Sequence, residues 1–319
     1  MSKDVSSQLT DKTGSDFNVL GDVLNTLRFR GSIFFRSQLA SPWGMSLGKF
    51  ESPRFHIALN GNFFLGSEDN DKQVVNIDYM DIVLLPHGES HWIADQPDRE
   101  LTQSQHAVEA CELGAPLFQQ GDITNQIMCG LVHFDKELLH PVISSLPSVL
   151  HFTNIKVDDP IWMSVMLIDA EMKETYASQT SIIDRLTEIL FLQLLNKYVN
   201  ENKDATGFFA AIRDRRIRRL LELIHQEPEL QWTLEMLGKR AGMSRATLAR
   251  QFKNEIDVSP MTYLTNWRMI KAYHLLKYSS QSLDEIAEMV GFSTARTLTK
   301  AFQRHFGYTP SDLRLNPRS

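Results

Sequence analysis

The residues with the clearest potential for chemistry are histidines in the first third of the chain. His56 lies in an apolar segment, and His87, Glu89 and His91 follow the apolar run 82–85. Iron, manganese and zinc accept imidazole and carboxylate ligands in proteins. His56 and His91 could therefore form a partial metal site. Internal hydrogen bonds or contact with an effector explain the same residues, and we predict neither a metal nor a cofactor.

Cys111 and Cys129, the two cysteines of the chain, offer thiol chemistry. A reversible disulfide between them would need Cα atoms within about 7 Å of each other. Two inert buried thiols are the alternative that we favour, because no basic residue beside either cysteine stabilises a thiolate. We predict a cytoplasmic protein without a membrane span. The prediction rests on the small number of cysteines, the polar segment 1–16 and the lack of an 18-residue apolar run.

The basic residues are distributed unevenly. The whole chain has a net charge of −6, but residues 208–319 contain 18 Lys and Arg against 11 Asp and Glu, a net charge of +7. The preceding residues therefore carry −13. This division indicates that only the C-terminal part meets a polyanion.

The basic segment repeats itself after 49 residues. Residues 234–244 match residues 283–293, and each copy continues into a Leu-x-x-x-Phe pair with a proline eight residues later. A glycine, Gly242 or Gly291, ends the first helix of each copy, because the tight turn needs a backbone geometry that other residues resist. The pattern predicts two helix-turn-helix motifs, at about 234–253 and 283–304.

The second helix of each motif is expected to bury one face and expose the other. Ser244 and Ser293 are the predicted N-caps. The predicted core residues are Leu248, Phe252, Leu298 and Phe302. The opposite face is polar and basic, and such a helix has the right width for the major groove. A helix at 260–278, about 27 Å long, could join two motifs that address grooves about 34 Å apart.

The second copy, residues 286–314, closely resembles the AraC-type transcription regulators, and residues 241–252 and 260–269 fit the same family. The resemblance implies an activator that binds double-stranded DNA and contacts RNA polymerase. The DNA-facing side chains that it implies are Arg245, Ala246, Ala249, Arg250 and Lys253 in the first helix and Thr294, Ala295, Arg296, Thr299 and Lys300 in the second.

Base reading is expected to differ between the two helices. Arg250 and Lys300 match positions where members of this family often place a base-reading arginine. Arginine grips guanine with two hydrogen bonds, whereas lysine acts more as a point charge. We therefore expect the first helix to read more of the sequence, while Lys253 and Arg304 position phosphates.

The front of the chain has the pattern of an all-β barrel or sandwich through about Asp135, with short β-branched and aromatic segments bounded by Gly, Pro, Asn and Asp. Residues 86–91 fit Pro-x-Gly-x-x-His, the second motif of cupin barrels, and residues 55–61 resemble the end of the first. The His-x-His pair of catalytic cupins is missing, and Arg54 stands where their glutamate would. The chain thus resembles the cupin-fronted branch of the AraC-type regulators.

The resemblance implies an α+β protein with two domains: an N-terminal cupin-like β-barrel followed by a two-helix dimerisation region, and an all-α C-terminal domain with tandem helix-turn-helix motifs. We expect helices at about 16–27, 159–176 and 181–199, the last two forming a dimer seam or closing the barrel, and a further helix that begins near Ala210. The predicted segments are a flexible tail (1–16), an effector or sensor domain (17–157), a dimerisation region (158–200), a linker (201–209) and a DNA-binding domain (210–317).

These features favour a sequence-specific DNA-binding transcription regulator and not an enzyme. A small-molecule effector, or a stress signal, would act through the cupin-like domain of a homodimer. The candidate effector-pocket residues are Trp43, Phe55, His56, His87, His91 and Trp92, although aromatic residues on barrel strands are more often core. A metal-dependent cupin enzyme fused to a DNA-binding domain and a ligand-independent DNA binder are the alternatives.

Overall fold

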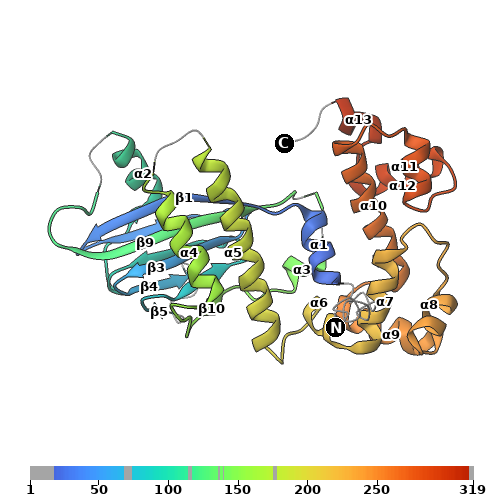
Figure 1. Ribbon diagram of the computed structural model, residues 1–319, viewed down its shortest axis with the longest axis horizontal. Helices are drawn as coiled ribbons and strands as arrows, with labels where there is room; N and C mark the ends of the chain where they lie inside the picture. Colours follow the sequence, from blue (N-terminus) through green and yellow to red (C-terminus); the bar gives the residue numbers. More distant parts are fainter. Residues whose placement is uncertain are drawn as a thin grey trace, which may run out of the picture. The chain divides into compact units, whose positions relative to one another are not determined.

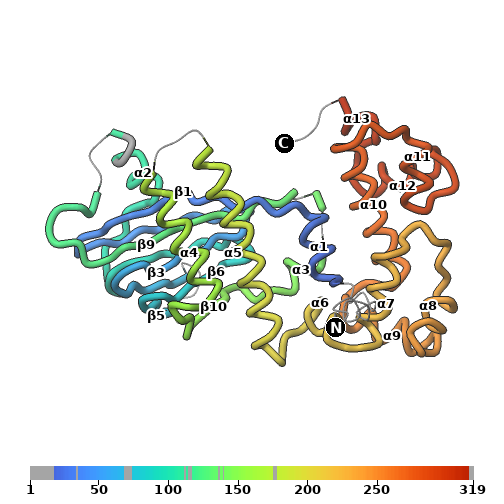
Figure 2. The backbone as a smooth tube through the Cα atoms, viewed as in Figure 1, coloured from blue at the N-terminus to red at the C-terminus, as the bar shows by residue number. Residues whose placement is uncertain are grey.

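The computed structural model describes residues 18–67, 74–113, 117–135, 137–138, 140–174 and 178–315. The chain forms two compact units: one contains the residues up to Thr26 and from Ala210 onward, and the other is Leu27–Phe209. Figures 1 and 2 trace the chain through both units. The predicted tail, 1–16, lies outside the described residues, and the predicted segment limits stay predictions.

Two five-stranded sheets form the centre of the Leu27–Phe209 unit (Figure 1). The first has the order β1 (Arg30–Ala40), β9 (Ile123–His133), β3 (Arg54–Asn60), β6 (Ile82–Leu85), β10 (Leu150–Phe152). The second has the order β5 (Val75–Ile77), β4 (Phe63–Ser67), β7 (His91–Ala94), β2 (Gly44–Leu47), β8 (Thr102–Gln103). Neighbouring strands are antiparallel, except that β2 and β8 are parallel.

The two sheets share one apolar core. Side chains from both inner faces are buried in it, among them Trp43, Met45, Phe63, Val83 and Ile127. The predicted fold class is confirmed, with one refinement: the described strands pair into two separate sheets and not into one hydrogen-bonded ring. The cupin-like domain is therefore a sandwich, closed by the packing of side chains.

Two helices lie against the first sheet: α4 (Pro160–Glu171) and α5 (Gln179–Glu201) (Figure 1). Helix α5 packs on β1 at Gly31, where a Cβ atom would stand 2.3 Å from that of Thr187. Only glycine permits this close approach of helix and strand. Helix α4 is tied to the same strand by an ion pair of 2.5 Å between Arg36 Nε and Asp169 Oδ1. Two shorter helices, α2 (Ser104–Glu112) and α3 (Pro141–Ser144), complete this unit.

The predicted linker, 201–209, ends in a buried segment. The amide of Phe208 donates a hydrogen bond of 2.9 Å to Ser145 Oγ. Phe208 and Phe209 are fully buried, and their rings contact His140 and Tyr198 edge-on. The last residues of this segment are therefore fixed to the Leu27–Phe209 unit by packing.

The other unit is helical. Its elements are α6 (Phe208–Arg213), α7 (Arg215–Gln226), α8 (Leu234–Ala241), α9 (Arg245–Ile256), α10 (Pro260–Tyr278), α11 (Leu283–Met289), α12 (Ala295–Phe306) and α13 (Pro310–Leu315). Helix α10 lies at its centre and contacts α9, α11, α12 and α13. One helix was expected from about Ala210, but the structure has two, because the Asp214 carboxylate accepts hydrogen bonds from the amides of Arg216 and Ile217 and caps a new helix there. None of the described helices is long and apolar enough to cross a membrane.

Helix α1 (Val19–Leu27) packs, up to Thr26, with this C-terminal unit. Its Asp22 accepts a hydrogen bond of 2.7 Å from His225 Nδ1 in α7 and lies 3.3 Å from the ammonium group of Lys271 in α10. The other ring nitrogen of His225 lies 2.8 Å from the hydroxyl of Tyr263. A short helix that precedes the sandwich in sequence thus supplies a carboxylate to the helical unit.

Candidate functional site

The first helix-turn-helix motif consists of α8 and α9. Gly242 ends α8 in the left-handed conformation, with a φ of 68°. The amide of Met243 then donates a hydrogen bond of 2.8 Å to the carbonyl of Gly238. Ser244 caps α9 by accepting a hydrogen bond from the amide of Thr247. The predicted turn glycine and N-cap of this motif are confirmed.

The second motif consists of α11 and α12, and its turn is longer. Gly291 adopts a φ of 79° after the last helical residue. The predicted cap Ser293 is wrong: Thr294 caps α12, and its hydroxyl accepts from the amide of Thr297. The extra residue in this copy's turn moves the start of the helix by one position, so the cap moves with it.

Both candidate recognition helices bury the face that the sequence predicts. Leu248, Phe252, Leu298 and Phe302 are fully buried. On the opposite faces, the predicted DNA-facing residues are exposed, except for three half-buried ones: Ala249, Ala295 and Thr299.

Five cations project from these exposed faces without an ion-pair partner among the described residues: Arg245, Arg250, Lys253, Arg296 and Lys300. The threonines of α12 are less available, because the hydroxyl of Thr294 serves as the cap and that of Thr299 donates to the carbonyl of Ala295. The exposed cations Arg296, Lys300 and Arg304 are therefore the main polar groups with which α12 can reach a ligand.

Inside the sandwich, His56, His91 and Cys129 form a buried chain of hydrogen bonds. His56 Nδ1 lies 2.9 Å from Cys129 Sγ, and His56 Nε2 lies 2.8 Å from His91 Nε2. His91 Nδ1 lies 2.8 Å from the carbonyl of Glu89, which can only accept. His91 must therefore carry its proton on Nδ1 and accept at Nε2, so His56 donates from Nε2 and accepts at Nδ1 from the thiol of Cys129.

Burial keeps the side chains of His56, His91 and Cys129 neutral. It lowers the pKa of His56 well below its ordinary value, and the neighbouring His91 and Arg54 add to the effect. Burial also lowers the pKa of His91 to about 4 and raises the pKa of the Cys129 thiol. A neutral thiol that donates to a histidine is a poor nucleophile. The side chain of Cys111, the other partner of the predicted redox pair, lies outside the described residues.

The same geometry does not suit a metal. His56 directs one nitrogen at His91 and the other at Cys129, so the three donor groups do not converge on one point. Within the described part of the chain, no three His, Cys, Asp or Glu residues are placed to hold an ion.

The remaining predicted pocket residues are spread through the sandwich. Trp43 is buried and donates from Nε1 to Asn125 Oδ1 at 2.9 Å. Phe55 is buried against Gly130, and the ring of Trp92 lies on Gly66.

His87 also lies apart from the histidine pair. It is half-buried, and its Nε2 donates to the carbonyl of Leu146 at 2.9 Å. Of the six predicted pocket residues, the structure thus joins only His56 and His91 by a hydrogen bond.

The sequence did not reveal a small apolar pocket between the sheets and α2. Its lining residues are Phe35, Met45, Leu47, Ile93, Ser104, Val108 and Cys129. They come from four strands and one helix, so no local pattern brings them together. The pocket shares Cys129 with the buried hydrogen-bond chain, and Ser104 is its other polar residue.

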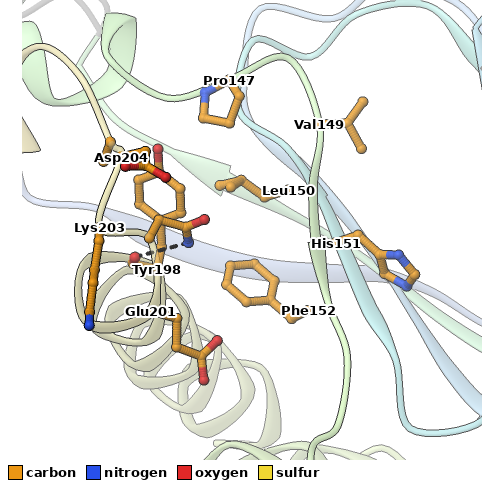
Figure 3. A pocket seen from close by; sticks show the side chains of 11 residues that line it. Pro147, Val149, Leu150, His151, Phe152, Tyr198, Glu201, Lys203 and Asp204 are labelled. Atoms are coloured by element: carbon orange, nitrogen blue, oxygen red, sulfur yellow. Dashed lines mark hydrogen bonds between the residues drawn. The ribbon is translucent and has the colours of Figure 1, made fainter.

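A larger cavity, of about 630 Å³, lies between the β10 region and the end of α5 (Figure 3). Its rim includes Glu201, Lys203 and Asp204, and Asn202 donates a hydrogen bond to the carbonyl of Tyr198. Glu201, Lys203 and Asp204 are exposed, as expected for a solvated surface hollow.

Comparison with known proteins gives consistent matches over both units. Residues 18–200 match a family described as Cupin, and residues 237–316 match one described as Helix-turn-helix domain. The HTH-type transcriptional regulator AlkR of Acinetobacter baylyi is 25% identical over 308 residues, which cover 93% of this chain and 99% of AlkR. A putative AraC-like transcription regulator of Streptomyces lividans is 26% identical over 306 residues, 93% of this chain and 98% of the relative.

Among solved structures, the DNA-binding domain of AdpA in complex with a target DNA is 30% identical, with a TM-score of 0.31. The match covers 33% of this chain and 99% of that domain.

Proposed function

The chain belongs to the cupin-fronted AraC-type transcriptional regulators, and from this premise we propose that it binds operator DNA as a homodimer under the control of a small-molecule effector. The observation that carries the proposal is the pair of matched helix-turn-helix motifs, whose exposed faces present five cations that have no ion-pair partner among the described residues. Such helices fit the major groove, and basic side chains neutralise phosphates or read base edges there.

Arg250 is the residue that we propose as the main base reader, because it projects from the exposed face of α9 and has no ion-pair partner in the part of the chain that the structure describes. In Arg250→Ala, we expect discrimination between operator and random DNA to fall by about 1–3 kcal/mol, the contribution of a bidentate contact to guanine. Footprinting on DNA upstream of the protein's own gene would locate the operator. Affinities for that site and for a random duplex would then give the discrimination.

The matched control is Lys253→Ala, one turn along the same helix. A residue that only neutralises phosphate should weaken binding to both duplexes by the same factor. If Arg250→Ala behaved in the same way, Arg250 would contact phosphate alone. A folded protein that protects no site, with or without candidate effectors, would refute the proposed function.

The apolar pocket is small, about 20 Å³, and would have to widen to admit a ligand, but its lining favours an uncharged, largely apolar effector. Five of its seven lining residues are hydrocarbon or thioether side chains, and its polar groups are the hydroxyl of Ser104 and the thiol of Cys129. A charged ligand there would lose its hydration without an ion partner. A thermal-shift screen of uncharged apolar compounds tests this, and selective stabilisation by charged compounds would contradict it.

The homodimer is supported by apolar side chains on the outside of the helical pair α4–α5. Met163, Met166 and Leu167 on α4 and Ile182 and Ile189 on α5 are exposed. Helix α4 is apolar on its buried side as well, as expected for a helix that has a second partner. We further propose that the dimer works in the cytoplasm and activates transcription through contact with RNA polymerase.

A further inference from the structure

The helix that precedes the first helix-turn-helix motif carries a basic surface of its own. Helix α7 buries its apolar face, including Ile217, Leu220, Leu221 and Ile224. Its opposite face exposes Arg215, Arg216, Arg218 and Arg219 within five consecutive positions. We name these four residues the α7 arginines.

The first turn of α7 adjoins the candidate recognition helix α9. Asp214, the N-cap of α7, accepts a hydrogen bond of 3.1 Å from the side chain of Gln251. Gln251 directly follows Arg250, the proposed base reader. The carboxylate of Asp214 also accepts from the amides of Arg216 and Ile217, so its hydrogen-bonding capacity is used within the protein. The turn that carries Arg215 and Arg216 therefore lies beside α9.

The four arginines differ in how their charge is compensated. Arg219 lies 3.2 Å and Arg218 3.6 Å from the carboxylate of Glu222 on the same helix. Arg215 and Arg216 have no ion-pair partner among the described residues. Among the α7 arginines, the two without an ion pair thus lie at the end of α7 next to α9, where the carboxylates of Asp214 and Glu255 also lie close to each other.

We propose that Arg215 and Arg216 bind DNA phosphates flanking the groove that α9 enters. The inference rests on the proposed function, because it requires α9 to lie in the major groove. A groove is bordered by two phosphate backbones, so a cationic turn beside a recognition helix faces the polyanion. Contacts of this kind fix the position and orientation of a protein on DNA without reading its sequence.

The test compares two double variants of the full-length chain. Arg215→Gln with Arg216→Gln removes the proposed contacts, and Arg218→Gln with Arg219→Gln removes the same charge from the next turn of the same helix. Affinities are measured for the footprinted operator and for a random duplex of equal length over a range of salt concentrations. Circular dichroism melting establishes that both variants are folded.

We expect the first variant to lose affinity for both duplexes by a similar factor, up to about 60-fold at 0.1 M salt. The slope of log affinity against log salt should become shallower by about 1.8, the release of counterions from two phosphates. The control variant should change the slope by less than a third of this, because Glu222 already compensates its arginines.

Equal slope changes in the two variants would overturn the proposal, since the effect would then be one of net charge. A loss confined to the operator would assign base reading to Arg215 and Arg216 instead. Unchanged DNA binding with reduced transcription in a purified system would point to an acidic protein partner and would also overturn it. If wild-type protein did not distinguish the operator from random DNA, the proposed function itself would fail.

Discussion

At the scale of single residues, the interior of the sandwich shows how hydrogen bonding fixes protonation. His91 donates to a carbonyl that cannot donate in return, and this one constraint determines the tautomers of His91 and His56 and the direction of the Cys129 thiol. Protonating either histidine would place two donors against each other within the core. These hydrogen bonds between His91, His56 and Cys129 therefore stabilise the sandwich only while both rings are neutral.

The stability of the Leu27–Phe209 unit should accordingly fall in acid. Histidine has a pKa of about 6.5 when unfolded, and the folded pKa values of His56 and His91 lie below this, that of His91 at about 4. The unfolded state thus binds more protons below pH 6.5. The contribution of each neutral histidine to the free energy of unfolding is complete above pH 6.5. It is lost as the pH falls, by up to about 1.4 kcal/mol per pH unit for each histidine.

Urea unfolding at pH 5, 6 and 7 measures this slope. The variant His91→Gln removes one titrating ring and should make the pH dependence shallower, whatever its effect on absolute stability. His106→Gln, a change at an exposed histidine, serves as the control. Equal slopes in the wild-type protein and in His91→Gln would show that the buried ring does not link protonation to folding.

At the scale of elements, the two helix-turn-helix turns look equivalent in sequence but should tolerate change differently. Gly242 and Gly291 both have positive φ, so alanine at either site costs roughly 1–2 kcal/mol. A Cβ at Gly242 would meet open space, whereas one at Gly291 would stand 2.6 Å from the carbonyl oxygen of Glu229. We expect Gly291→Ala to destabilise the helical unit by at least about 1 kcal/mol more than Gly242→Ala, the cost of a backbone clash in a packed site.

Thermal unfolding of the two single variants, followed by circular dichroism, tests this difference. Each variant is the control for the other, because the residue change and the place in the motif are the same. Equal melting temperatures would show that the segment around Glu229 moves aside at no cost.

The elements that the sequence predicted well are those with local signals. The turn glycines and the apolar pairs in α9 and α12 fix both motifs within short windows, and the starts of α8 and α10 fall at Leu234 and Pro260 as predicted. The break before α7 was missed because apolar periodicity continues through Asp214. The capping hydrogen bonds of the Asp214 carboxylate start a new helix there. Ser293 was mistaken for the cap because two hydroxyl residues stand side by side.

The candidate sites depend on long-range pairing, which the sequence does not encode locally. Cys129 reaches His56 because β9 pairs with β3 across 73 positions of sequence. The apolar pocket needs β1, β2, β7, β9 and α2 together. His56 and His91 were considered together as a partial metal site; they do lie side by side, but as hydrogen-bond partners.

At the scale of the whole molecule, the exposed apolar face of α4–α5 predicts self-association. Met166→Glu with Leu167→Glu places two charges per copy on the proposed dimer seam. We expect the dimer dissociation constant to rise by at least about 100-fold, because a two-fold interface contains both side chains twice and the loss of only about 0.7 kcal/mol of apolar burial at each of these positions gives that factor.

Sedimentation velocity over a range of protein concentrations measures this constant. Leu113→Glu is the matched control, because Leu113 is equally apolar and more exposed but lies outside the α4–α5 face. A wild-type protein that stays monomeric, or a double variant that dimerises normally, would refute the seam.

The chain passes between its two units twice, once after Thr26 and again after Phe209. A single protease cut near residue 204 would therefore release residues 205–319 as a separate chain, but α1, still joined to the sandwich, would keep its Asp22 contacts to His225 and Lys271 of that fragment. A truncated DNA-binding fragment that starts at residue 208 would lack Asp22 and leave His225, which is buried, without its carboxylate. Fusions or truncations that keep only the C-terminal third would thus lack both the Asp22 carboxylate and the sensor domain. Their phenotype would combine the two effects. Co-expressing residues 1–27 as a separate peptide offers a way to tell the two apart.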